Sequence, residues 1–231
     1  MSLQEHYDAM RTVAVRQLLQ GEAELDLLLE VPEQDSRRGL TLLARPPAAV
    51  TARIAEVLAT VQRAEPNQYY YPASDTHLTI LSIISCYPGF SLHLVDSAAY
   101  RQLVGTVLRA VGPFRIRYAG LTVSAGGIMV QGFPEDDSLE KLRNALRVAF
   151  RHSSLPQSID QRYALRTAHS TVVRFTTPLR DPAHLVALVQ QEQQTRIGSF
   201  EVDTLELVFN DWYQRAANTV QLEQYRLPYH P

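Results

Sequence analysis

Two short segments of the chain share one pattern. The segment THLTILSIIS, residues 76–85, contains HLTI, and the segment RTAHSTVVRF, residues 166–175, contains HSTV. Each tetrapeptide reads His-x-Thr followed by an apolar residue, whereas a chain with this many histidines and threonines would contain about half a His-x-Thr by chance. The first segment is apolar, β-branched and bounded by turn residues, and both are predicted to be the central strands of their halves of the chain.

Side chains alternate across a strand, so each motif places an imidazole and a hydroxyl on one face. His77 and Thr79 form one such pair, and His169 and Thr171 form the other. If the two strands are related by the pseudo-twofold axis of a duplicated fold, one cleft collects all four side chains. One neutral imidazole can then accept a proton, a protonated one can donate, and the hydroxyls can donate to phosphoryl oxygens. This set of groups suits cleavage of a phosphodiester.

The order of predicted elements repeats, with a central strand, a helix, a long strand and a returning strand occurring twice. Helices are predicted over residues 7–19, 47–64, 96–110, 135–152 and 182–193, and strands over 39–46, 76–85, 114–123, 127–131, 166–175, 198–210 and 218–227. The repeat therefore predicts an α+β (α/β) fold that is duplicated in two lobes. The predicted organisation is a helical extension over 1–38 and one phosphoesterase-like domain over 39–231, with lobe-like repeats at about 39–134 and 135–231.

Composition limits the function classes. A chain of 231 residues and 26.0 kDa with 45% hydrophobic and 20% charged residues is sufficient for one two-lobed unit with a sizeable core. The net charge of -2 argues against binding to an extended nucleic-acid duplex. No apolar run reaches the roughly 18 residues of a membrane span, and the acidic N-terminus lacks a secretion-signal pattern. The single cysteine, Cys86, excludes an internal disulfide and a thiolate metal cage. We expect a cytoplasmic monomer.

The two motifs resemble those of the two-histidine phosphoesterase superfamily, which includes bacterial 2′-5′ RNA ligase-like proteins and cyclic nucleotide phosphodiesterases. The resemblance extends by element order over residues 39–227. It implies a bilobal duplicated fold with two antiparallel-rich sheets flanking a central cleft and helices outside. It also implies metal-independent hydrolysis of a 2′,3′-cyclic phosphate or a 2′-5′ phosphodiester of RNA or a nucleotide, with His77 and His169 catalytic and Thr79 and Thr171 binding phosphate. Ser170 departs from the pattern, because many members carry an apolar residue there.

Other candidate residues lie near the motifs. Tyr71, with Tyr69 and Tyr70, precedes the first motif and could stack on a nucleobase or pin the loop to the core. Arg162 and Arg166 precede the second motif and could neutralise a phosphate, although charged residues that flank a strand are usually solvated. By strand alternation Arg174 would lie on the face opposite His169, so we expect it to be structural. Cys86 lacks a neighbouring base and is predicted to be a buried thiol.

Neither motif has a third ligand at metal-binding spacing, so no metal site and no cofactor are predicted. The predicted partner is a small nucleotide or an RNA end, with no membrane involved. Two alternatives remain open: a non-catalytic module that binds a nucleotide or RNA end, and an enzyme that acts on another small phosphorylated substrate. The sequence does not distinguish hydrolysis from ligation, and it does not assign the acid and the base between the two histidines.

Overall fold

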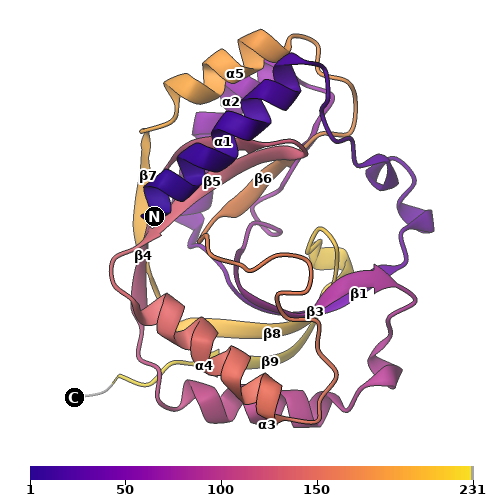
Figure 1. Cartoon of the computed structure of the whole chain (residues 1–231), viewed down its shortest axis with the longest axis vertical. Coiled ribbons are helices and arrows are strands. Elements are labelled where there is room, and N and C mark those ends of the chain that lie inside the picture. Colours follow the sequence, from indigo (N-terminus) through magenta and orange to yellow (C-terminus); the bar gives the residue numbers. More distant parts are fainter. Residues whose placement is uncertain (230–231) are drawn as a thin grey trace.

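The computed structural model describes residues 1–229 and shows an α+β fold with two antiparallel sheets (Figure 1). The predicted fold class is confirmed. The last two residues of the predicted domain over 39–231 lie outside the described part of the chain. None of the described helices is long and apolar enough to span a membrane.

Each sheet is built from strands that are far apart in the sequence. The first sheet contains, in spatial order, β3 (Leu78–Pro88), β1 (Arg37–Ala44), β8 (Thr204–Asp211) and β9 (Val220–Arg226). The second contains β2 (Tyr69–Tyr70), β6 (Ser170–Arg174), β5 (Gly127–Pro134), β4 (Phe114–Ser124) and β7 (Arg196–Val202). All neighbouring strands in both sheets pair antiparallel. The first motif therefore belongs to an edge strand of one sheet, and the second belongs to the other sheet.

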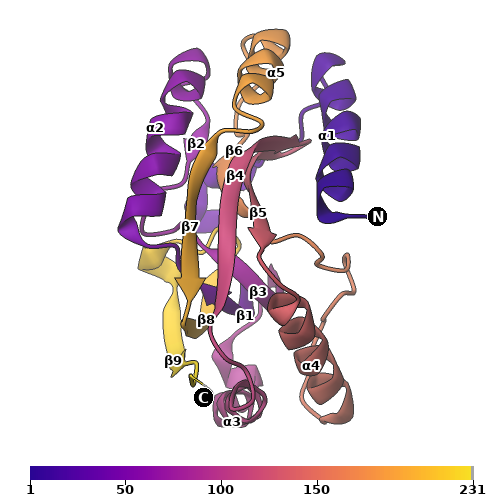
Figure 2. The ribbon, with the colours of Figure 1, turned by 90° about the vertical axis from the view of Figure 1, so that its left-hand side faces the viewer.

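The helices are divided between the two sheets. They are α1 (Leu3–Leu19), α2 (Ala48–Ala64), α3 (Ser97–Leu108), α4 (Ser138–His152) and α5 (Pro182–Gln191), with short 3-10 turns at Leu27–Leu29, Pro32–Gln34, Leu92–Leu94 and Ala216–Asn218. Helices α1, α2 and α5 lie side by side along the second sheet (Figure 2), where they contact β4 and β7. Helices α3 and α4 pack on each other and on strands of the first sheet. The helices thus cover the outside and leave the space between the sheets to other side chains.

Local sequence signals explain where the helices begin. Asp96 caps α3 by accepting hydrogen bonds from the main-chain N–H groups of Ala98 and Ala99, at 3.0 and 3.3 Å. Helix α1 begins at Leu3, four residues before the predicted start, because Ser2 and Glu5 form a capping box. The prediction from apolar spacing alone missed this start, since the first turn of α1 is polar.

The segment 198–210 was predicted as one strand, and this was wrong. The structure divides it at Asp203 into β7, which pairs with β4 in the second sheet, and β8, which pairs with β1 and β9 in the first. The carbonyl of Asp203 accepts a hydrogen bond of 2.7 Å from the N–H of Leu227. Both halves of the segment are extended and alternately buried, so the change of sheet leaves no break in the hydrophobic pattern.

Each sheet takes strands from both of the predicted repeats, 39–134 and 135–231. The first sheet pairs β1 with β8, and the second pairs β5 with β6. The interface between the repeats is therefore a set of main-chain ladders rather than a surface between two separate bodies.

Candidate active site

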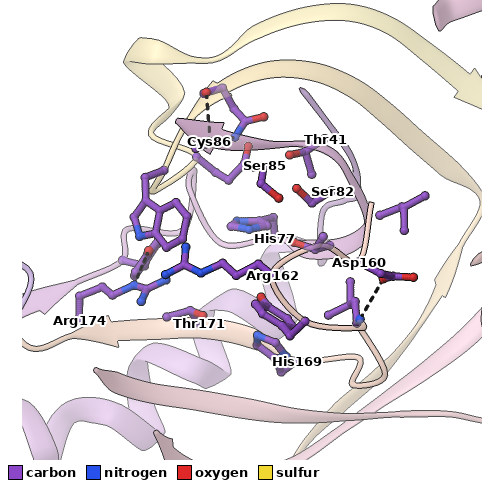
Figure 3. A pocket seen from close by; sticks show the side chains of 18 residues that line it. Thr41, His77, Ser82, Ser85, Cys86, Asp160, Arg162, His169, Thr171 and Arg174 are labelled. Atoms are coloured by element: carbon purple, nitrogen blue, oxygen red, sulfur yellow. Dashed lines mark hydrogen bonds between the residues drawn. The ribbon is translucent and has the colours of Figure 1, made fainter. Parts of the chain in front are cut away.

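One cavity between the two sheets contains both motifs. It has a volume of about 150 Å³, and His77, Thr79, His169 and Thr171 all line it. Figure 3 shows His77 on one side of this cavity and Thr171 and His169 on the other, beside the facing strand β6. We refer to this cavity as the central pocket. It brings together the four residues that strand alternation predicted to share a cleft.

His77 is held by the main chain two residues before it. Its Nδ1 lies 2.7 Å from the carbonyl oxygen of Asp75, and a carbonyl can only accept, so Nδ1 carries the hydrogen. Asp75 is itself buried, and its carboxylate accepts hydrogen bonds from the Ser74 hydroxyl at 2.8 Å and from the Ala216 N–H at 3.0 Å. Burial lowers the pKa of His77 to about 4, and the hydrogen bond to Asp75 partly opposes that shift. The neutral imidazole therefore presents an unprotonated Nε2.

His169 is held by a side chain instead. Its Nδ1 lies 2.6 Å from the hydroxyl of Thr167, which is 5% exposed. A hydroxyl can donate or accept, so this contact persists in either protonation state of the ring. Burial, together with the positive charges of Arg143 and Arg174, lowers the pKa of His169 to about 3. The two histidines thus differ in the partner of Nδ1 and in the charge behind the ring.

Bulges determine which other side chains of the motif strands reach the central pocket. In β3, Thr79 pairs with Leu43 and Leu81 with Leu42, so one extra residue is inserted between them, and a second insertion follows Ser82. Each extra residue reverses the alternation. As a result Thr79, Ser82 and Ser85 all line the pocket at a spacing of three residues.

A bulge in β6 places Arg174 on a different face from the predicted one. In β6, Thr171 pairs with Met129 and Val173 pairs with Ile128, which leaves Val172 as the extra residue. Strict alternation placed Arg174 on the face opposite His169, but the bulge returns it to the side of the pocket, which it lines. Its guanidinium Nε donates to the hydroxyl of Tyr71 at 3.4 Å.

The tyrosines and arginines around the motifs separate into those that reach the central pocket and those that do not. Tyr71 is 9% exposed and lines the pocket with its hydroxyl engaged by Arg174. Tyr70 instead donates to the carbonyl of Glu65 at 3.0 Å. Arg162 lines the pocket, whereas Arg166 is exposed and borders a different hollow beside α4. The structure therefore does not place Arg166 with the motifs.

Sequence reasoning missed Trp212, which follows β8 and lines the central pocket. Three guanidinium groups lie over its ring, with centroid distances of 5.1 Å for Arg37, 4.5 Å for Arg162 and 5.9 Å for Arg174. Such contacts hold a cation against the negative face of the indole. The available signal was that this residue is the only tryptophan of the chain and directly follows the polar pair Asn210 and Asp211.

Cys86 also lines the pocket, but its chemistry is blocked. Burial raises the pKa of its thiol to about 12, so the nucleophilic thiolate does not form near neutral pH. The side-chain N–H of Asn210 approaches Sγ at 3.5 Å.

Within residues 1–229, no three or more His, Cys, Asp or Glu side chains gather in a way that could hold a metal ion.

Comparison with protein-family models and with curated proteins finds no match. Comparison with solved structures finds several chains of similar fold. The TT0787 protein of Thermus thermophilus superposes with a TM-score of 0.58 at 17% identity, over 82% of this chain and 97% of that one. E. coli LigT complexed with 3′-AMP gives 0.55 at 16% identity, over 83% of this chain and 98% of that one. A structure described as a phosphoesterase gives 0.52 at 16% identity, over 83% and 98%. The chain has the fold of LigT.

Proposed function

We propose that this protein is a metal-independent phosphodiesterase of the two-histidine type, acting on a 2′,3′-cyclic phosphate or a 2′-5′ phosphodiester of RNA or a nucleotide. The observation that carries the proposal is the arrangement of two imidazoles in one cavity, each fixed through Nδ1. This leaves Nε2 of both rings for reacting atoms. A site that only bound a nucleotide would have no need for two imidazoles held in this way.

The surroundings of the two rings favour His77 as the acid and His169 as the base. Asp75 can accept from Nδ1–H of His77 in the imidazolium state, which stabilises the protonated ring. Burial and positive charges oppose protonation of both rings, but the pKa falls further for His169, to about 3, than for His77, to about 4, and Arg143 makes the largest of the charge contributions at His169. The negative charge of a phosphate bound between the rings favours protonation of one of them. By this comparison the protonated ring is that of His77.

The two proton transfers then need no further group. His169 Nε2 takes a proton from water as the water oxygen forms a bond to phosphorus, and the bond from phosphorus to the ribose oxygen breaks. His77 Nε2–H gives its proton to that leaving oxygen. The cyclic diester becomes a phosphomonoester, and the two rings return to their starting states by exchanging protons with solvent.

Phosphate charge is met by donors around the rings. The hydroxyls of Thr79 and Thr171 line the pocket beside the histidines, and the guanidinium of Arg174 lies on the same wall. Donors fixed before the reaction stabilise the charge that develops on the phosphoryl oxygens. The E. coli LigT structures with 3′-AMP and with phosphate support a ligand of this kind, because both compounds carry the group that these side chains would bind.

The substrate test is a panel of 2′,3′-cyclic nucleotides, 2′-5′ oligonucleotides and an ADP-ribose cyclic phosphate, assayed with EDTA present. Formation of a phosphomonoester from one of them, lost in both His77→Ala and His169→Ala, is the expected result. Tight binding of a nucleotide without turnover of any panel member would instead identify a binding module. Turnover in either histidine variant at the wild-type rate would refute the two-histidine mechanism.

A further inference from the structure

Helix α4 carries a buried cation directly behind the motif strands. Arg143 is 3% exposed, and its guanidinium donates to three main-chain carbonyls. Nε donates to Ile80 at 2.8 Å, and Nη2 donates to Thr79 and to Thr167, both at 2.9 Å. Burying a guanidinium that binds only carbonyls costs desolvation free energy. We therefore asked what Arg143 does for the central pocket.

No carboxylate of residues 1–229 forms an ion pair with Arg143. The nearby Arg147 differs, because it pairs with Asp160 at 2.6 Å. Burial lowers the pKa of Arg143 to about 10, which still leaves the guanidinium charged at neutral pH. No carboxylate therefore pairs with it directly, and Asp160 and Glu140 offset its charge only in part, from a greater distance.

The three carbonyls belong to different sheets. Thr79 and Ile80 lie in β3 of the first sheet, and Thr167 lies just before β6 of the second. Strands β3 and β6 share no main-chain ladder. One side chain thus connects the strand of His77 to the segment of His169 from behind the pocket, and the hydroxyl of the same Thr167 contacts His169 Nδ1.

Tyr7 of α1 binds β5 next to the segment that leads to His169. The Tyr7 side chain is fully buried, and its hydroxyl donates to the Gly132 carbonyl at 3.1 Å and accepts from the Gly132 N–H at 3.2 Å. A Cβ on Gly132 would lie 1.8 Å from the carbonyl oxygen of Ala168, so β5 and the residue before His169 are in close contact there. Tyr7 therefore braces the segment that Arg143 binds.

The charged and titratable groups around His169 come from several elements. Arg143 on α4 and Arg174 on β6 lower the pKa of His169 by their positive charge, and His77, just before β3, opposes protonation of His169 when it is itself protonated. The loop before the second motif contributes Asp160, Arg162 and Tyr163 to the pocket wall. Arg143 is the largest of the charge contributions to His169.

We propose that Arg143 is a positioning residue of the site, which sets the separation of the two histidines by binding both motif strands and places a fixed positive charge behind His169. The catalytic part of this inference rests on the proposed function. The electrostatic part concerns the folded protein alone and is measured without turnover.

The experiment compares Arg143→Met, which removes the charge and the three hydrogen bonds, with Arg143→Lys, which keeps the charge but cannot reach all three carbonyls. Arg151→Met is the matched control, since Arg151 is exposed on the same helix. The His169 ring is titrated by NMR, with its signals assigned by their loss in His169→Asn. Steady-state kinetics use whichever cyclic nucleotide the wild-type protein hydrolyses.

In Arg143→Met we expect the pKa of His169 to rise by about one unit and kcat to fall about 100-fold, with KM changed less than about threefold. In Arg143→Lys we expect an unshifted pKa and a kcat about tenfold below wild type. If Arg143→Met does not fold, Arg143→Lys decides, and wild-type kcat in that variant overturns the positioning role. A His169 pKa that is the same in folded Arg143→Met as in Arg151→Met overturns the electrostatic role, even if no substrate has been found.

Discussion

The hydroxyl of Ser170 donates a hydrogen bond to the main-chain carbonyl of His77, so the second motif holds the first across the space between the sheets. The same hydroxyl lies 2.6 Å from the hydroxyl of Tyr118. Ser170 is 1% exposed and occupies the position where the resemblance led us to expect an apolar residue. The departure is thus a polar connection between the two motif strands.

Replacing Ser170 with alanine should destabilise the protein and impair turnover together. The change leaves the His77 carbonyl and the Tyr118 hydroxyl buried without this partner, which costs about 1–3 kcal/mol of unfolding free energy. Urea unfolding measures that loss, and kcat should fall by about tenfold as the spacing of the motifs relaxes. Ser154→Ala, at an exposed position beyond α4, is the control and should leave both quantities unchanged. An undiminished kcat in a destabilised Ser170→Ala would show that the contact serves stability alone.

Removing either motif imidazole should abolish activity without unfolding the chain. We expect His77→Ala and His169→Ala each to lose about three or more orders of magnitude in kcat, because each takes part in a proton transfer. Thr79→Ala and Thr171→Ala should lose less, since each removes one of several donors to the phosphate. Circular dichroism checks folding, and His93→Ala, at an exposed position, is the matched histidine control. Comparable losses in His93→Ala would point to a different site.

The buried neutral histidines should make the protein less stable in mild acid. Their folded pKa values, about 4 for His77 and about 3 for His169, lie below the ordinary value of 6.5. The unfolded chain therefore binds protons in this range before the folded chain does, and stability falls as the pH drops from about 6.5 towards 4. The effect should be about 3 kcal/mol for each ring. Urea unfolding across this range should show a flatter dependence in His77→Gln/His169→Gln, and equal slopes in the two proteins would contradict the assignment.

Turnover should survive an excess of EDTA. Proton transfer comes from the two imidazoles, and the phosphate charge is met by hydroxyls and by Arg174, so no step requires a metal ion. The measurement compares initial rates of the purified enzyme before and after dialysis against chelator. Recovery of activity only on adding manganese or zinc would overturn the mechanism.

Trp212 should report on occupancy of the central pocket. It is the only tryptophan of the chain, and it lines the pocket under the Arg162 guanidinium. A nucleotide that enters should displace or reorient that guanidinium and change the indole fluorescence. Titration with 3′-AMP should therefore give a saturable signal that is absent in Trp212→Phe. A nucleotide that binds by calorimetry with no fluorescence change would lie outside the pocket.

The sequence predicted those parts of the fold and site that depend on regular periodicity. The pairing of imidazole and hydroxyl in each motif follows from strand alternation, and α4 follows from the spacing of its apolar residues. Arg174 was misplaced because a bulge at Val172 shifts the alternation, and a bulge has no signature in a run of β-branched residues. Arg143 was missed because its partners are main-chain carbonyls brought together only by the tertiary fold.

The exchange of strands between the repeats constrains how the chain can fold. Strand β1 lies between β3 and β8, and β8 pairs on its other edge with β9, near the end of the described chain. During synthesis β1 and β3 leave the ribosome long before β8. One edge of β1 is therefore unpaired until β8 has been made. Ladders between such distant segments form slowly because the intervening loop must close first. The sheet that contains β3 is therefore completed late, through the pairing of β1 with β8, and nascent chains that end before residue 211 should remain prone to edge-to-edge association.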